Sequence, residues 1–318
     1  MTQRIWRISA AILVALFAIS SPALAQDAET DEAAAARDRK IQILRVKQDE
    51  GAGTVELIVA LPAAIGEVAP TTSNFGVIEG QNNKTFTVEP VEDNVDVVIV
   101  VDTSGSMRGA PLTAARQAAA GFIDRLPPEA RVSVVGFGAT PTVLTTFEND
   151  RSSSRSAVNS LVARGETALW DALLTASETA TAGGSRAPYI VVLSDGGDTA
   201  SVGTQAQANA ALEQAGATLY AITLETAESD HRALLSTADE VSGTVLATGD
   251  IGALETLFDE VGDRLNHRYR IVIKSDRTDE RALRVSVAIE GAIATASTTI
   301  GVGGAPTAPV AEVPTSLG

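Results

Sequence analysis

Between residues 94 and 267, short runs of aliphatic residues alternate with segments of helical spacing, and this alternation constrains the fold most. The first run, at 95–101, is aliphatic apart from one Asp, which is typical of a strand buried on both faces. Further strands are expected at 131–137, 143–147, 189–194, 218–224 and 244–247, and helices at 111–126, 154–163, 168–181, 204–215, 230–241 and 251–267. Strands that alternate with helices predict an α/β domain with a doubly wound, mainly parallel sheet.

Strand patterns also occur on both sides of this region. The expected strands are 41–46, 54–59 and 84–88 before it, and 269–274, 283–289 and 294–300 after it. Neither flank has enough strands for two packed sheets. We therefore expect residues 40–93 and 268–301 to pair into one accessory antiparallel β-sandwich, with the α/β domain of residues 94–267 inserted between them.

The first 25 residues have the pattern of a secretory signal peptide. Arg4 and Arg7 precede an almost wholly apolar run at 8–20, and an Ala-x-Ala pattern ends at Ala25. The run is shorter than the roughly 20 residues that a spanning helix needs, although an uncleaved N-terminal anchor is the alternative. We expect an exported protein, periplasmic, cell-surface or secreted, after cleavage near Ala25, with no further membrane-spanning segment. A polar linker is expected at 26–39 and a disordered tail at 302–318.

Composition narrows the chemistry that the chain can perform. It has 24 Lys+Arg and 40 Asp+Glu, a formal charge of -16, two His and no Cys. The acidic balance argues against nucleic acid and anionic membranes as partners, because both attract basic surfaces. The absence of Cys excludes disulfides and thiolate metal sites, and His231 and His267 have no metal-ligand spacing. What remains is oxygen chemistry, by carboxylates, hydroxyls and the hard cations that they bind.

Such oxygen ligands follow the first strand of the α/β domain, where residues 102–106 read Asp-Thr-Ser-Gly-Ser. Asp102, Ser104 and Ser106 stand at alternate positions of a tight loop, and Gly105 permits the backbone to reverse. The carboxyl edge of a doubly wound sheet is where ligands bind, and such oxygens suit Mg²⁺ or Mn²⁺. Taken alone, the motif is equally consistent with a helix N-cap that has spare hydroxyls.

Two further loops strengthen the case for a site. Thr167 precedes a predicted helix, and Asp195 follows the predicted strand at 189–194. In a doubly wound sheet all three loops open on the same edge. Five oxygen-bearing side chains are then expected to converge, namely Asp102, Ser104, Ser106, Thr167 and Asp195.

This combination resembles the von Willebrand factor type A (VWA) domain and its metal-ion-dependent adhesion site (MIDAS) over residues 94–267. The resemblance implies a Rossmann-like fold in which the two serines and the threonine ligate Mg²⁺, Mn²⁺ or Ca²⁺ directly or through water. The two aspartates would ligate the ion or hold its waters. One coordination position is left in this family for the Asp or Glu of a protein partner, which implies a non-enzymatic binding or adhesion module. Residues 102–109 and 193–199 are also similar to bacterial exported members, some associated with type II secretion or tight-adherence F proteins, so pilus or secretion assembly is a suggested setting.

Four neighbouring residues are candidates for a second layer around the ion: Gly105, Glu166, Asp171 and Asp198. Because the first layer around the ion would contain only two acids, a divalent ion there would stay electrophilic toward an incoming carboxylate. Glu166 would weaken acidic ligands if it pointed inward, and is otherwise a solvated loop charge. Asp171 and Asp198 have alternative roles at a helix N-terminus and in a turn.

Two enzymatic alternatives are disfavoured. A haloacid-dehalogenase-like phosphatase needs a second carboxylate where this chain has Ser104, and a Lys near the phosphate. Lys occurs only at 40, 47, 84 and 274, outside the α/β domain. A serine hydrolase would need a Gly-x-Ser-x-Gly motif or a paired His, and neither is evident.

Overall fold

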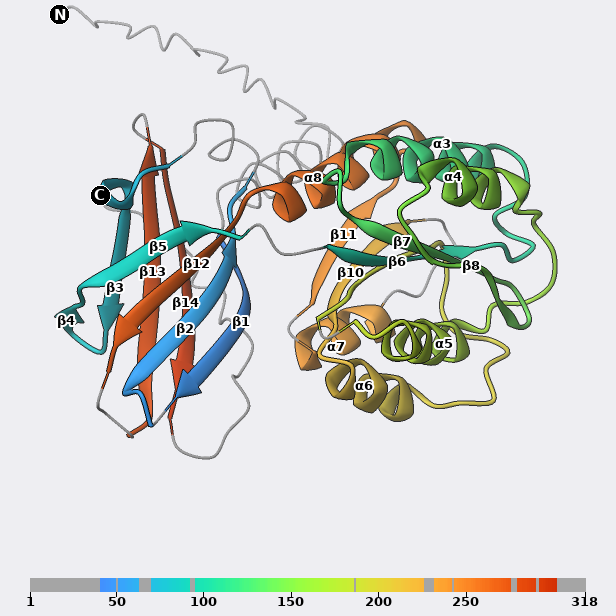
Figure 1. Ribbon diagram of the computed structural model, residues 1–318. Helices are drawn as coiled ribbons and strands as arrows, with labels where there is room; N and C mark the ends of the chain where they lie inside the picture. Colours follow the sequence, from blue (N-terminus) through green and yellow to red (C-terminus); the bar gives the residue numbers. More distant parts are fainter. Residues whose placement is uncertain are drawn as a thin grey trace, which may run out of the picture. The chain divides into compact units, whose positions relative to one another are not determined.

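The computed structural model describes residues 41–49, 51–62, 70–91, 95–185, 187–225, 232–241, 243–275, 279–289 and 292–301. The expected signal peptide, polar linker and disordered tail lie outside these residues. The described part contains a six-stranded sheet with helices on both faces and two four-stranded sheets (Figure 1). This confirms the predicted fold class. Within the same part of the chain, no helix is both long and apolar enough to cross a membrane.

The six-stranded sheet has the order β11-β10-β9-β6-β7-β8. Its strands are β6 (Asp96–Asp102), β7 (Arg131–Phe137), β8 (Pro141–Glu148), β9 (Tyr189–Ser194), β10 (Thr218–Leu224) and β11 (Thr244–Thr248). All neighbours are parallel except β8, which runs antiparallel to β7. The chain goes from β6 to β7 on one side and later returns to β9 on the other, so the strand order reverses between β6 and β9. Such a switch point is where open α/β sheets bind ligands.

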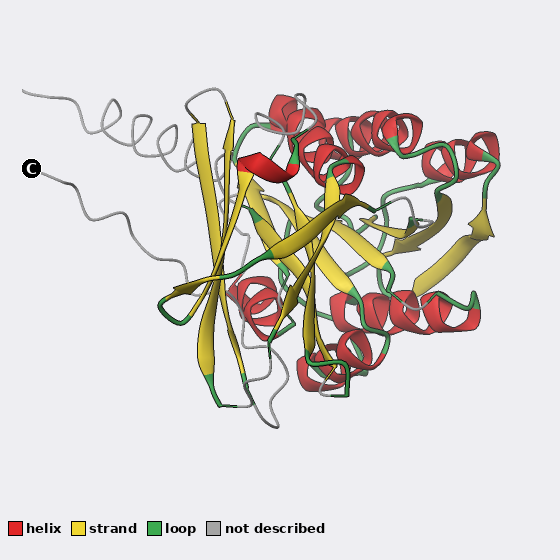
Figure 2. Cartoon of the chain, turned by 60° about the vertical axis from the view of Figure 1, so that its left-hand side comes forward, coloured by secondary structure: helices red, strands yellow, loops and turns green. Residues whose placement is uncertain are grey.

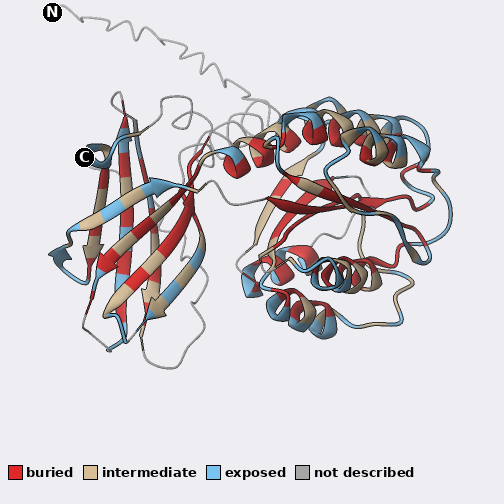
Figure 3. Ribbon diagram, viewed as in Figure 1, coloured by how far each residue is buried: buried red, intermediate tan, exposed pale blue. Residues whose placement is uncertain are grey.

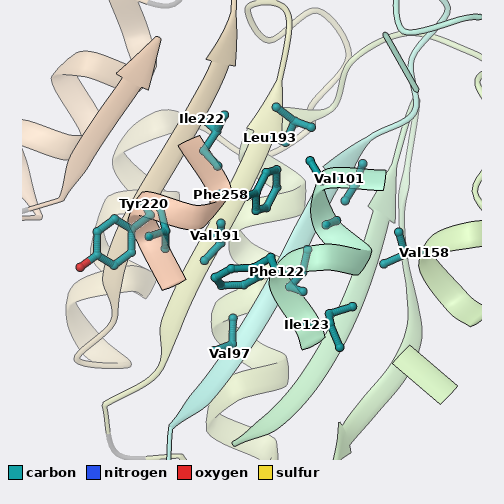
Figure 4. Close-up of a cluster of buried hydrophobic side chains, with 14 of the residues drawn as sticks. Val97, Val101, Phe122, Ile123, Val158, Val191, Leu193, Tyr220, Ile222 and Phe258 are labelled. Atoms are coloured by element: carbon teal, nitrogen blue, oxygen red, sulfur yellow. The ribbon is translucent and has the colours of Figure 1, made fainter. Parts of the chain in front are cut away.

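Helices cover both faces of this sheet (Figures 1 and 2). They are α3 (Ala110–Arg125), α4 (Arg151–Ser160) and α8 (Leu254–Asn266) on one face, and α5 (Leu169–Ala182), α6 (Gln205–Gln214) and α7 (Arg232–Glu240) on the other. Alternate residues of β6 serve the two cores: Val97 and Val101 pack in the cluster of Phe122 and Phe258, whereas Val98 packs in the cluster of α5. Figure 4 shows the first cluster, and Figure 3 shows how fully the central strands are buried. The two buried faces fix β6 firmly in the sheet.

The two four-stranded sheets each combine strands from both flanks of the chain. Their orders are β1-β2-β12-β5 and β14-β13-β3-β4. The strands are β1 (Gln42–Asp49), β2 (Thr54–Ala60), β3 (Phe75–Glu79), β4 (Asn82–Asn83), β5 (Phe86–Pro90), β12 (Arg268–Lys274), β13 (Arg281–Ile289) and β14 (Ala292–Ile300). Apolar residues of both sheets form one buried cluster, as in a β-sandwich. The sequence analysis missed β3, a short strand whose aliphatic pattern is interrupted by Gly76.

A buried carboxylate lies in this sandwich. Glu79 is 2% exposed and accepts a hydrogen bond from Arg281 Nε at 2.7 Å and another from the Ser275 hydroxyl. Lys84 Nζ lies 3.0 Å from its second oxygen. Burial alone raises the pKa of the Glu79 carboxyl, but the bonds from Ser275, Lys84 and Arg281 outweigh it and lower the pKa from its usual 4.5.

Candidate metal centre

The candidate site lies at the carboxyl ends of the adjacent strands β6 and β9. These strands are paired in parallel, with Val101 opposite Leu193. Asp102 is the last residue of β6 and Ser194 the last of β9, so the first and third predicted loops begin side by side. The fold thus brings together two segments about 90 residues apart in the sequence.

Asp102 forms the buried base of the first loop. Its side chain is fully buried, and both of its oxygens have hydrogen-bond donors. Oδ1 accepts from the Ser104 backbone N–H at 2.7 Å, and Oδ2 accepts from the Ser194 hydroxyl at 2.6 Å. The Thr103 N–H and hydroxyl both donate to the Phe137 carbonyl, at 2.6 and 2.8 Å. These bonds fix the turn that carries Ser104 and Ser106.

Hydroxyl and carboxylate groups from two loops meet above Asp102. Ser104 Oγ lies 2.9 Å from Ser106 Oγ, and the Ser106 hydroxyl donates to Asp195 Oδ1 at 2.9 Å. A hydroxyl has one hydrogen, so Ser106 accepts from Ser104 while it donates to Asp195. Four of the five predicted residues are thus joined through hydrogen bonds, with Asp102 contacting the Ser104 backbone.

Thr167 lies where the three loops meet. The Gly105 N–H donates to the Gly165 carbonyl at 2.9 Å and the Arg164 N–H to the Thr103 carbonyl at 2.6 Å, which ties the Thr167 loop to the first loop. Thr167 is buried, and in the part of the chain that is described its hydroxyl has no hydrogen-bond partner. The side chain can therefore give its oxygen to a ligand.

The third loop also holds the backbone of Thr167. The Thr199 N–H donates to the Thr167 carbonyl at 2.8 Å, and the Thr167 N–H donates to the Thr199 hydroxyl at 3.0 Å. This reciprocal pair sets the position of Thr167 relative to the loop that begins at Asp195. Sequence reasoning did not select Thr199, although it directly follows Asp198 in the third motif.

Asp198 and Asp171 fasten the loop of residues 198–203 to the first turn of α5. Asp198 Oδ1 accepts from the Leu169 N–H at 2.8 Å and from the Ser201 hydroxyl. Asp171 Oδ2 accepts from the Val202 N–H at 3.0 Å, and its Oδ1 from the Gly203 N–H at 2.8 Å. Carboxylates at the N-terminal end of a helix accept hydrogen bonds from its free N–H groups and interact favourably with the positive end of the helix dipole. These contacts correspond to the helix-terminus and turn roles considered above.

The remaining two candidates of the second layer lie on the surface. Gly105 is exposed and contacts the neighbouring loop through its N–H. Glu166 is exposed beside Thr167, in agreement with a solvated charge. A residue that sequence reasoning overlooked is Ser194, which orients Asp102. Its signal was a hydroxyl at the end of an otherwise apolar strand.

Burial determines the electrostatics of the two acids. It raises the pKa of Asp102, although hydrogen bonds from Ser194 and Ser104 oppose the rise. Burial likewise raises the pKa of Asp195, opposed by the bond from Ser106. A cation beside both carboxylates would offset the cost of burying their charge. Among the described residues, no group of three or more His, Cys, Asp and Glu could hold a metal, so a cation here would need hydroxyl oxygens among its ligands. Two carboxylates with three hydroxyls fit a hard divalent cation.

Comparison with known proteins agrees with the fold of the α/β domain. Residues 97–197 match the family model of the von Willebrand factor type A domain. The chain contains a VWA domain. The matched range includes all five predicted metal-binding residues and ends just before Asp198, so the loop of residues 198–203 lies outside it.

Relatives of the VWA domain cover only part of the chain. A UPF0353 protein of Mycolicibacterium paratuberculosis is 37% identical over 113 residues, which are 32% of this chain and 34% of that protein. An uncharacterized protein of Synechocystis is 34% identical over 105 residues, 32% of this chain and 25% of that protein. The matches thus span about a third or less of these relatives' length. A von Willebrand factor type A structure from Catenulispora acidiphila has a TM-score of 0.50 and 16% identity, covering 82% of this chain and 73% of that chain, and shows a shared fold.

Proposed function

We propose that this VWA domain binds a divalent cation, Mg²⁺ or alternatively Mn²⁺ or Ca²⁺, and uses it to capture a carboxylate of a protein partner. The observation that carries the proposal is the continuous contact from Ser104 through Ser106 to Asp195, with 2.9 Å between successive oxygens. Oxygens from two separate loops gather there next to the buried Asp102. The match to the VWA family supports the same function.

The residues divide into ligands and supports. The hydroxyls of Ser104, Ser106 and Thr167 and the carboxylate of Asp195 would hold the cation. Asp102, whose oxygens already accept from Ser104 and Ser194, would orient this set and balance its charge. When bound, the cation would supply a Lewis acid for an oxygen ligand from outside.

A binding role is favoured over catalysis. The Ser104 hydroxyl contacts the Ser106 hydroxyl, which donates to Asp195. A serine hydrolase would instead need a histidine as the base, and His267 lies at the C-terminal end of α8. No Lys occurs between residues 84 and 274, so no lysine of the VWA domain could neutralise a phosphate. We therefore propose a non-enzymatic module. Its export after cleavage near Ala25, and a role at the cell surface or in pilus or secretion assembly, are proposed from the sequence alone.

Thermal unfolding in Mg²⁺ and in EDTA tests the cation. A ligand at roughly 100 times its Kd stabilises by about 2.7 kcal/mol, which raises Tm by about 5–11 °C for a domain of this size. The matched variant is Asp102→Asn, because the amide keeps an acceptor for the Ser104 N–H and donates to the Ser194 hydroxyl, which can turn to accept. It should lose most of the Mg²⁺ response and unfold in EDTA no earlier than the wild type.

The control for this test is Ser160→Ala, which removes an exposed hydroxyl at the end of α4. It should keep the full response to Mg²⁺. If the wild type unfolds at the same temperature in EDTA and in about 10 mM Mg²⁺, Mn²⁺ or Ca²⁺, the ion contributes no stabilisation and the proposed cation site is wrong.

A further inference from the structure

Two arginines lie beside the candidate metal centre. Arg108 follows Ser106 by two residues, and its N–H donates to the Gly105 carbonyl at 3.3 Å. The Arg164 N–H donates to the carbonyl of Thr103 at 2.6 Å. Both arginines are exposed. Their long side chains are therefore accessible to a ligand that binds beside these loops.

The fold does not use the side chain of either arginine. Within the described residues, the guanidinium groups of Arg108 and Arg164 make no ion pair or hydrogen bond. Other arginines of the domain do: Arg131 is held by Asp96 at 2.7 Å, and Arg155 by Asp124 at 2.7 Å. The two guanidinium groups therefore offer positive charge beside the site, in a chain whose formal charge is -16.

Two exposed aliphatic side chains lie on the loops that carry Arg164 and contact Thr167. Val202 is 94% exposed and Val162 is 64% exposed, the two highest values for large hydrophobic residues in the described part of the VWA domain. Val162 precedes Arg164 by two residues. Val202 lies on the loop that bonds to Thr167, and its N–H is fixed by Asp171. A side chain on a fixed backbone loses little freedom when it is covered.

We propose that the partner of this site is an acidic peptide segment with at least two carboxylates and an aliphatic residue. One carboxylate would meet the cation, so the inference rests on the proposed function. A second would pair with Arg108 or Arg164, since guanidinium groups bind carboxylates through two parallel hydrogen bonds. The aliphatic residue would contact Val162 or Val202. A lone carboxylate is common to all protein surfaces, so selection among partners needs such additional contacts.

Selection from displayed random dodecapeptides tests this partner chemistry. The full chain is immobilised, binding takes place in Mg²⁺, and bound peptides are released with EDTA. Peptides with two or more Asp or Glu and an aliphatic residue should be several-fold enriched over the starting library. No EDTA-released pool at all would remove the proposed function and this inference with it, whereas an EDTA-released pool enriched for a single acid would overturn only the inference.

Charge reversal then identifies the contact on the protein. The affinity of an enriched peptide, measured by fluorescence anisotropy, should fall about two- to fivefold for Arg108→Glu or Arg164→Glu and about tenfold for both. Arg45→Glu on β1 changes the net charge of the chain by the same amount as each single variant and concerns an exposed residue of the sandwich. It should leave the affinity within about twofold. Equal losses for Arg45→Glu and the site variants would show that only the total charge matters and refute the contact.

The valines are tested separately. Val162→Ser combined with Val202→Ser should weaken the same peptide several-fold and leave the Mg²⁺-dependent rise in Tm unchanged. If the double variant binds the peptide as the wild type does, the aliphatic part of the proposed partner is wrong. All of these positions are exposed, and unfolding curves in EDTA verify that the variants fold.

Discussion

The two acids beside α5 offer a sharp test of the loop geometry, because they use their oxygens differently. Asp198 accepts all of its hydrogen bonds at Oδ1. The donors are the Leu169 N–H, the Ser201 hydroxyl and, at the longer distance of 3.4 Å, the Trp170 N–H. Asp171 instead divides its two bonds between Oδ1 and Oδ2. Asparagine retains one acceptor oxygen and replaces the other with a donor. Asp198→Asn can therefore keep its bonds, whereas Asp171→Asn must lose one.

The magnitudes follow from these contacts. Asp198→Asn loses only a charge near a helix N-terminus, which is worth about 0.3–1 kcal/mol. Asp171→Asn loses a similar charge and also one hydrogen bond, and it places an amide NH₂ against a backbone N–H. The exposed Val202 N–H can turn to water instead, so the additional loss is about 1 kcal/mol. Asp171→Asn should therefore unfold about 2–4 °C below Asp198→Asn.

Unfolding in EDTA, followed by circular dichroism and by the fluorescence of Trp170, measures this difference. Trp170 is buried in the first turn of α5, so it reports on the segment that both acids hold. Alanine at either position removes every acceptor, and the two alanine variants should be similarly destabilised. If Asp198→Asn proves as unstable as Asp198→Ala, the single-oxygen arrangement is incorrect and charge is what stabilises the turn.

Three further expectations concern the loops and the sandwich. Thr199→Val should reduce the Mg²⁺-dependent rise in Tm because the Thr167 backbone N–H loses the Thr199 hydroxyl as its acceptor, whereas Thr199→Ser should retain the rise. The stability that ionised Glu79 provides is present above pH 4.5 and is lost as the pH falls through the lowered pKa of Glu79 in the folded state. The free energy of unfolding in urea should therefore fall between about pH 5 and 3, and Glu79→Gln should flatten this dependence on pH. Gly165 has a φ of 82°, and an added Cβ would lie 3.2 Å from the Ala139 nitrogen, so Gly165→Ala should cost about 1–3 kcal/mol in thermal unfolding.

Much of the α/β domain was predictable because its strands are buried on both faces. The predicted bounds of β7, β9 and β10 coincide with those observed, since each is a mainly apolar run that is bounded by turn-forming or charged residues. Boundaries were less accurate where burial is partial. The edge strand β8 extends beyond the predicted 143–147 at both ends, and the helix expected at 251–267 begins as a short 3-10 turn before α8.

The candidate site could be predicted in outline because its residues follow strands that end at one edge of the sheet. Sequence position alone, however, does not say which oxygen accepts from which donor. Ser194 and Thr199 became evident only when β9 was aligned with β6 and the third loop was placed against Thr167. These are tertiary contacts, and no local pattern in the chain specifies them.

The residues proposed to hold the cation and those proposed to select the partner differ in what the fold requires of them. Asp102 and Thr167 are buried, and their backbones or side chains bond to neighbouring loops, so changes there affect the shape of the site. Arg108, Arg164 and Val202 are exposed, and their side chains are not needed to build the loops. Substitution can therefore alter the choice of partner while the cation site is preserved. If both proposals hold, proteins with the same five residues at the cation site can recognise different acidic segments through these surface positions alone.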